Sequence, residues 1–270
     1  MKTTTIAVTA LCFIALSALV FTSCQRERDT DLTEGEETAL MERTGDDVVS
    51  ITDQASTGQI SQFKKERGGC ATITIDTLSA PHTITVDFGA TNCLCQDGKN
   101  RRGQIIRSFT GKYKDAGSTH AIRYNNYFVN DNQLKGIKTV TNNGLNTAGN
   151  PNYTIDTKDT IIKANNAGTV TWMSNRNREY TVGFNTPVWS DDVFMVTGSG
   201  SGIRANGYSW SMNITTPLTI DCSCKYRIVA GELQIQPQGK PLRTLNYGSG
   251  ACDDAATLTI NNKVFAFNFK

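Results

Sequence analysis

The sequence predicts an all-β fold of antiparallel, multi-stranded sheets from about Arg67 to the C-terminus. Many short runs alternate apolar and polar residues with a period of two, and clusters of Asn, Gly and Asp separate these runs. Helix formers such as Ala, Leu and Glu become sparse after Arg67. Alternation of this kind is typical of strands with one buried and one solvent-facing side.

The N-terminus has the features of a bacterial lipoprotein signal. Lys2 precedes an apolar run from Ile6 to Phe21, which leads to Thr22-Ser23-Cys24. The run of 16 residues is short for a bilayer-spanning helix, which needs about 20 residues. We therefore expect residues 1–23 to be cleaved as a signal peptide and Cys24 to carry the lipid; a cleaved signal without lipid is the alternative. The protein would then be anchored to the outer membrane, facing the periplasm or the cell surface.

Charge divides the remaining chain into two parts. Residues 24–66 contain 5 Lys/Arg and 11 Asp/Glu, a net charge of −6, whereas residues 67–270 contain 21 and 14, a net charge of +7. We expect residues 24–66 to be an acidic flexible tether. Four residues within it, Leu40, Val48, Ile51 and Ala55, could form a short, weakly amphipathic helix. The β-rich body, 67–270, is too weakly basic to predict nucleic-acid binding.

The body begins with two alternating runs. Ile73 and Ile75 alternate with threonines, and Ile84, Val86 and Phe88 form the apolar side of the next run. Further strands are expected at 103–109, 120–129, 136–142, 153–162, 169–174, 179–184, 193–199, 207–214, 225–230, 232–236 and 241–246. The Gly-Ser repeat at 198–202 is expected to be a flexible hairpin turn.

The chain ends in a predicted β-hairpin. Asn261-Asn262 can adopt the positive φ angles of a type I′ turn. This turn would pair Ile260 with Lys263, Leu258 with Phe265 and Ala256 with Phe267.

Six cysteines follow Cys24, an even number that predicts disulfides in an exported chain. They are Cys70, Cys93, Cys95, Cys222, Cys224 and Cys252. A four-thiolate zinc site made from the two Cys-x-Cys pairs is the alternative, although structural zinc ligands more often have two residues between them.

The cysteines also mark a degenerate duplication. "VDFGATNC" ends at Cys93 and "LNYGSGAC" ends at Cys252, and each follows two alternating runs after an earlier cysteine. Pseudo-repeat units around 70–145 and 168–270 would form two related lobes, with Cys70 bonded to Cys93 and Cys224 to Cys252. Cys95 and Cys222 would then either bridge the units or stay reduced.

Residues suited to catalysis are few. His82 and His120 are the only histidines, and each lies beside a predicted turn. The acidic pairs at 191–192 and 253–254 and the Asn-Asp-Asn at 130–132 are best explained as turn residues, with calcium ligands and glycosidase carboxylates as alternatives. Trp172, Trp189 and Trp210 are expected in the core, with a sugar-stacking platform as the alternative. We predict no catalytic residue, no metal and no cofactor.

One segment concentrates positive charge. A polyanion-binding patch for a phosphate or acidic glycan is one interpretation, and the solvated face of a strand pair is the other. The basic residues are Lys99, Arg101, Arg102, Arg107, Lys112 and Lys114.

Four segments resemble a family of lipoproteins from the Bacteroidota to which no activity is assigned. They are "DFGATNCLCQDGKNRRGQIIRSFTGKY" at 87–113, "NNYFVNDNQLKGIKTVTNNG" at 125–144, "GTVTWMSNRNREYTVGFNT" at 168–186 and "NYGSGACDDAATLTINNKVF" at 246–265. The resemblance covers most of residues 70–270 and the lipobox. It implies a lipoprotein and no particular reaction.

Together these features predict a lipid-anchored protein of the cell envelope. A non-enzymatic binding, assembly or structural module is the leading interpretation, and a secreted glycan-acting hydrolase is the alternative. The expected partners are the membrane, through the lipid on Cys24, and envelope proteins or glycans, without nucleic acid.

Metabolic labelling with an alkyne fatty acid tests the anchor. The wild-type protein should carry the label and Cys24→Ala should not, because the thiol is the attachment point. Label on Cys24→Ala at the wild-type level would contradict the prediction.

Overall fold

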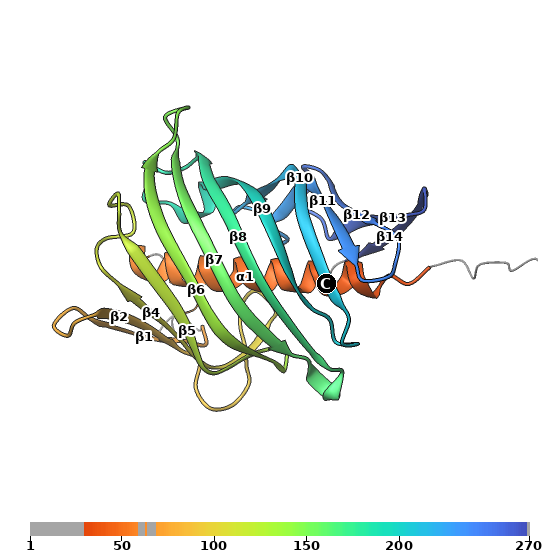
Figure 1. Ribbon diagram of the computed structural model, residues 1–270. Coiled ribbons are helices and arrows are strands. Elements are labelled where there is room, and N and C mark those ends of the chain that lie inside the picture. Colours follow the sequence, from red (N-terminus) through yellow and green to blue (C-terminus); the bar gives the residue numbers. More distant parts are fainter. Residues whose placement is uncertain (1–29, 59–62, 64–68, 269–270) are drawn as a thin grey trace, which may run out of the picture. The chain divides into compact units, whose positions relative to one another are not determined.

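The computed structural model describes residues 30–58, 63 and 69–268 (Figure 1). The predicted signal peptide, residues 1–23, and Cys24 lie outside these residues. Within them, the all-β, antiparallel fold predicted from the sequence is confirmed, and the strands form one 14-stranded sheet. Its strands are β1 (Thr72–Asp76), β2 (His82–Asp87), β3 (Cys93–Leu94), β4 (Asn100–Phe109), β5 (Thr119–Val129), β6 (Asn132–Leu145), β7 (Pro151–Ile162), β8 (Thr169–Val182), β9 (Val193–Ile203), β10 (Ser209–Asp221), β11 (Ile228–Pro237), β12 (Arg243–Ser249), β13 (Ala255–Ile260) and β14 (Lys263–Asn268).

The sheet is a meander in which each strand pairs with the next along the chain. The short strand β3 is the exception, because it pairs with β4 while β2 also pairs with β4. Two 3-10 turns, Ala164–Asn166 and Trp189–Asp191, interrupt the connections. The two cysteine-marked units therefore lie in one continuous sheet and do not form separate lobes.

The helix α1 (Thr33–Thr57) lies along the inner face of this curved sheet (Figure 1). For residues 33–57 this corrects the expectation of a flexible tether at 24–66; residues 24–29, 59–62 and 64–66 lie outside the described residues. The helix is 25 residues long, and Val48 and Ile51 are 0% and 1% exposed, so it is neither short nor loosely packed. It ends at Gly58, which adopts the left-handed conformation (φ 76°) typical of a helix C-terminus. Among the described residues, no helix is long and apolar enough to cross a membrane.

Glycines allow the strands to bend around the helix. Gly103 has a φ of +79°, and a Cβ on it would lie 1.9 Å from the carbonyl oxygen of Asn126. The β4–β5 register shifts at this point, which identifies a bulge. Gly231 (φ +107°) has the same role, and it joins the expected strands 225–230 and 232–236 into the single strand β11.

Other sequence-based boundaries also change because the strands are long and bent. The expected strand 169–174 and residues 179–182 of the expected strand 179–184 are both part of β8, which ends at Val182. The Gly-Ser repeat at 198–202 lies inside β9 and is not a turn. A Cβ on Gly202 would lie 1.8 Å from the carbonyl oxygen of Thr171 on β8, so the close approach of these strands requires glycine there.

The C-terminal hairpin is confirmed in register and turn. Ile260 pairs with Lys263, Leu258 with Phe265 and Ala256 with Phe267. Asn261 and Asn262 both have positive φ, 49° and 64°, as a type I′ turn requires.

The two predicted disulfides are also present. Cys70 bonds to Cys93 and Cys224 bonds to Cys252. Cys95 and Cys222 are buried, reduced thiols, which is the second of the two outcomes predicted for them. Because one cysteine of each Cys-x-Cys pair is in a disulfide, the four-thiolate zinc site cannot form.

The core between helix and sheet combines apolar side chains with ion pairs. Residues 33–57 contain seven acids and one base, a net charge of −6. Six of the seven acids form ion pairs with Lys or Arg from the sheet or its connections. The pairs are Glu34 with Lys240 and Arg243, Glu37 with Lys163 and Arg204, Glu42 with Arg176, Asp46 with Arg227, Asp47 with Lys99, Arg101 and Arg227, and Asp53 with Arg107 and Arg178.

Asp47 is the most heavily paired of these acids. Its carboxylate lies 2.7 Å from Arg101 and 2.8 Å from Lys99, and the Arg101 side chain is fully buried. Removing one partner of a buried ion pair leaves the other charge buried without compensation, which typically costs about 3–5 kcal/mol.

We therefore expect Asp47→Asn to lower the free energy of unfolding by about 3–5 kcal/mol, measured by urea denaturation. Asp131→Asn is the control, because Asp131 pairs with Arg102 at the surface and should change stability little. Equal effects of the two substitutions would contradict a stabilising role for the buried pairs.

Candidate functional site

Two loops of the sheet and one strand turn meet over the middle of α1 and enclose a charged pocket of about 320 Å³. We call it the loop pocket. It is lined by Arg43 and Asp46 of α1, Asp97, Gly98 and Lys99 of the β3–β4 loop, Asn130 of the β5–β6 turn, Lys225, Tyr226 and Arg227 of the β10–β11 loop, and Ile228 at the start of β11.

The β3–β4 loop is held in place at both ends. The disulfide to Cys70 fixes Cys93 at its start. The Cys95 amide donates to the Lys99 carbonyl at 2.9 Å, and the Gly98 amide donates to the Cys95 carbonyl at 2.9 Å. Gly98 has a φ of +80°, a conformation that favours glycine. Lys99 is thereby directed towards α1.

The β10–β11 loop is held in a similar way. The disulfide between Cys224 and Cys252 ties it to the segment before β13. The Asp221 amide donates to the Arg227 carbonyl at 2.8 Å, which closes the loop, and the Asp221 side chain accepts from the Ser223 amide at 2.9 Å. Both loops that frame the pocket are therefore cross-linked.

The floor of the pocket is the charged surface of α1. Asp46 accepts from the Arg227 Nε at 2.7 Å, and the Lys99 Nζ lies 2.8 Å from Asp47. Burial alone would raise the pKa of Asp47, but the charges of Arg101, Lys99 and Arg227 outweigh burial and hold this pKa well below its ordinary value. The ionised Asp47 carboxylate therefore neutralises part of the positive charge beside the pocket.

The lining residues still carry excess positive charge. Four are basic (Arg43, Lys99, Lys225 and Arg227) and two are acidic (Asp46 and Asp97), which gives a net charge of +2. Burial lowers the pKa of Arg43, and nearby groups including Asp47 partly offset this effect. Lys225 is exposed, and its Nζ lies 5.2 Å from the centre of the Tyr226 ring.

The predicted polyanion patch is not assembled on one surface. Because side chains on a strand alternate, Arg101 and Arg107 point inward from β4 and are fully buried against Asp47 and Asp53. Arg102 points outward and pairs with Asp131.

The other members of that patch also separate. Lys112 and Lys114 lie in the β4–β5 loop, where Lys114 donates to the carbonyl oxygen of Phe184. Only Lys99 reaches the loop pocket.

The acidic pairs do not converge on a substrate-sized cavity. Asp191 accepts from the Thr186 hydroxyl at 2.8 Å, whereas burial raises the pKa of Asp192 to about 6. The cavity beside Asp192 is only about 20 Å³, too small for a sugar ring. Asp253 accepts from the Ala255 amide at 3.0 Å, as expected of a turn residue. Among the described residues, no group of three His, Cys, Asp or Glu is arranged to hold a metal.

The aromatic residues expected in the core are found there. Trp172 and Trp210 are buried, and Trp189 packs against the core while partly exposed. His120 is also buried: its Nδ1 accepts from the Arg107 Nε at 3.1 Å.

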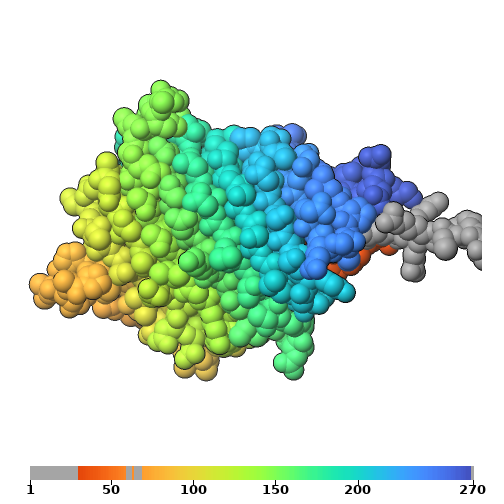
Figure 2. All heavy atoms as spheres, viewed as in Figure 1, coloured from red at the N-terminus to blue at the C-terminus, as the bar shows by residue number. Residues whose placement is uncertain are grey.

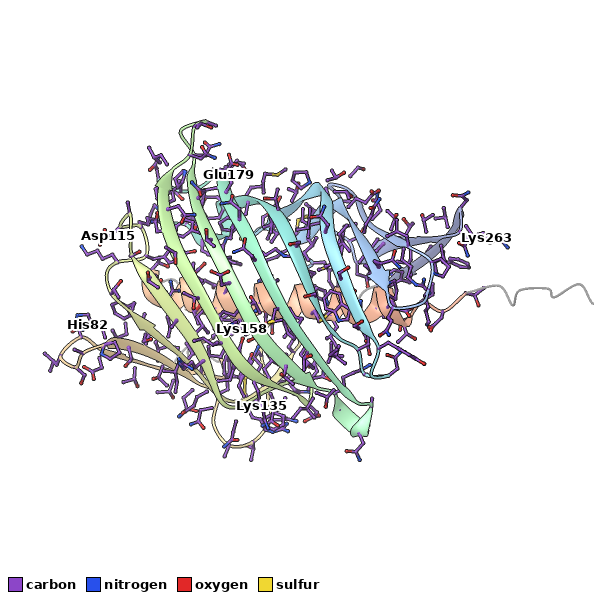
Figure 3. The ribbon with its side chains drawn as sticks, in the orientation of Figure 1. His82, Asp115, Lys135, Lys158, Glu179 and Lys263 are labelled. Carbon is purple, nitrogen blue, oxygen red and sulfur yellow. A yellow bond between two sulfur atoms is a disulfide. The ribbon has the colours of Figure 1, made fainter. Side chains whose placement is uncertain are left out.

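A second, shallower hollow of about 880 Å³ lies on the outer face of the sheet, across β6 to β10. Short hydroxyl and amide side chains line it, including Thr139, Asn175, Ser199, Ser201 and Ser211. Figure 2 shows this face, and Figure 3 labels Lys158, another of its lining residues, near the middle of it. Its lining also includes the charged Asp156 and Lys158 and the apolar Ile137 and Met173, so hydroxyl, charged and apolar groups all face this hollow.

No protein family, curated protein or solved structure matches this chain.

Sequence reasoning missed five of the six charged residues of the loop pocket, namely Arg43, Asp46, Asp97, Lys225 and Arg227. The useful signal was the charge asymmetry: an N-terminal part of net charge −6 precedes a body of net charge +7. Opposite charges in one chain indicate that the acidic part could fold back onto the basic part.

The buried histidine generates a prediction about pH. Burial and the neighbouring Arg107 lower the pKa of His120 to about 3 from 6.5. The unfolded chain therefore binds a proton near pH 6.5 that the folded chain does not, so stability should be lost as pH falls from 6.5 towards 3. His120→Asn keeps a hydrogen-bond acceptor but cannot bind this proton.

We therefore expect the wild-type advantage in unfolding free energy over His120→Asn to shrink between pH 7 and pH 4.5. Urea denaturation at a series of pH values measures it. A difference that stays constant with pH would contradict the assignment.

Proposed function

We propose that this protein is a lipid-anchored, non-enzymatic binding module of the cell envelope. The loop pocket is the observation that carries the proposal. It is large enough for part of a small molecule, since ligand sites have volumes of about 300–1,000 Å³. Its two main loops are cross-linked by disulfides, so it needs little ordering when a ligand binds.

The chemistry of the pocket favours binding over catalysis. Its lining contains no serine, cysteine or histidine that could act as a nucleophile or a base at neutral pH. Asp46 is held by Arg227, and Asp97 accepts from Arg101 at 2.6 Å and 2.7 Å. Both carboxylates are therefore already engaged by guanidinium groups.

The proposed anchor would keep this module close to the membrane. Eight residues lie between Cys24 and Thr33. Counted from Cys24 to Thr33, an extended chain of this length spans at most about 30 Å. The candidate partners are therefore glycans and proteins of the envelope.

A panel of envelope glycans tests binding against hydrolysis. The purified full-length protein is incubated with peptidoglycan, lipopolysaccharide and capsular polysaccharide. Retention on the glycan and release of new reducing ends are then measured on the same samples. We expect retention of at least one glycan without release.

Release of reducing ends would overturn the proposal in favour of the glycan-acting hydrolase, and the absence of retention on every glycan would also count against it. Ser199→Trp and Ser201→Trp, which fill the outer hollow, distinguish glycan binding there from binding at the loop pocket.

A further inference from the structure

We propose that the loop pocket binds a phosphate monoester carried by an envelope glycan or lipid headgroup. This inference rests on the proposed binding function and names the ligand class of the same site.

The charge of the pocket selects the ligand. The lining has four cations and two carboxylates, and the adjacent Arg101 and Asp47 cancel each other. The excess is therefore two positive charges. A phosphate monoester carries about −1.5 to −2 charges at pH 7, which matches this excess. One carboxylate would neutralise only half of it, and a metal cation would be repelled.

The arrangement of the cations also suits an anion. Arg43 projects from α1, Lys99 from the β3–β4 loop, and Lys225 and Arg227 from the β10–β11 loop, so positive groups border the pocket from three segments. Lys99 and Arg227 are tied to α1 carboxylates at 2.8 Å and 2.7 Å and are fixed in position. Lys225 is exposed and is placed to approach a ligand that enters.

The burial of Arg43 also favours an anionic ligand. Its guanidinium is partly buried, and burial lowers its pKa, which means that the surroundings disfavour its charge. A phosphate oxygen would offset that cost, because Arg donates charge-assisted hydrogen bonds to phosphate in a fixed geometry. The pocket volume of about 320 Å³ leaves room for part of the group that carries the phosphate.

Isothermal titration calorimetry with the full-length chain tests the assignment. The probes are glucose 6-phosphate, glucose and inorganic phosphate, and vesicles with and without phosphatidic acid form a separate arm. We expect glucose 6-phosphate to bind and glucose not to bind. The vesicle arm distinguishes a lipid headgroup from a phosphorylated sugar, and binding should weaken with added salt.

Lys225→Gln is the main variant, because Lys225 is exposed and its replacement should leave the fold intact. We expect it to weaken glucose 6-phosphate binding at least tenfold. Lys263→Gln is the matched control and should leave the affinity unchanged, because Lys263 is an exposed lysine at the start of β14 and lines neither the loop pocket nor the outer hollow (Figure 3).

Equal binding of glucose and glucose 6-phosphate, no binding of any phosphate probe, or equal weakening by the two lysine variants would overturn the inference. Failure here is distinguishable from failure of the proposed function. If the protein retains a glycan without cleaving it, and the glycan needs no phosphate for this, the proposed binding function stands and only the phosphate inference fails.

Discussion

The fold depends on the neutralisation of α1 by the inner face of the sheet. A helix with a net charge of −6 can be buried only if nearly every acid meets a cation, because an isolated buried charge is very unfavourable. The cations come from positions as distant as Lys99 and Arg243. The position of α1 and the register of the strands are therefore coupled. Sliding the helix by one turn, or a strand by one residue, would separate several ion pairs at once.

This constraint explains the composition of the inner face. Along β7, alternate residues from Tyr153 to Ile161 are buried, and they include Thr157 and Asp159 beside apolar side chains. Asp159 pairs with the buried Lys138 at 2.7 Å within the sheet itself. A cavity of about 70 Å³ remains between α1 and the sheet near Lys138 and Arg176.

Sequence patterns over a few residues predicted the features of the fold that depend on interactions between residues close together in the chain. The hairpin at Asn261-Asn262 was predicted in full, because turn chemistry and alternation act over a few residues. The disulfide pairs followed from the internal similarity of the two units. The helix at Thr33–Thr57 was underestimated because its stability comes from cations far away in the chain. Gly231 was read as a break, although a bulge lets one strand continue through it.

The basic segment that begins at Lys99 shows why the candidate site could not be read from composition. Alternation along β4 sends Arg101 inward and Arg102 outward, so charges adjacent in the sequence lie on opposite faces of the sheet. The loop pocket instead collects Lys99, Arg43 and Lys225 from segments that are far apart in the chain. Each has an ordinary sequence context, and only the return of α1 beneath both loops brings their charges together. The same helix that is neutralised by the sheet therefore also contributes Arg43 and Asp46 to the pocket.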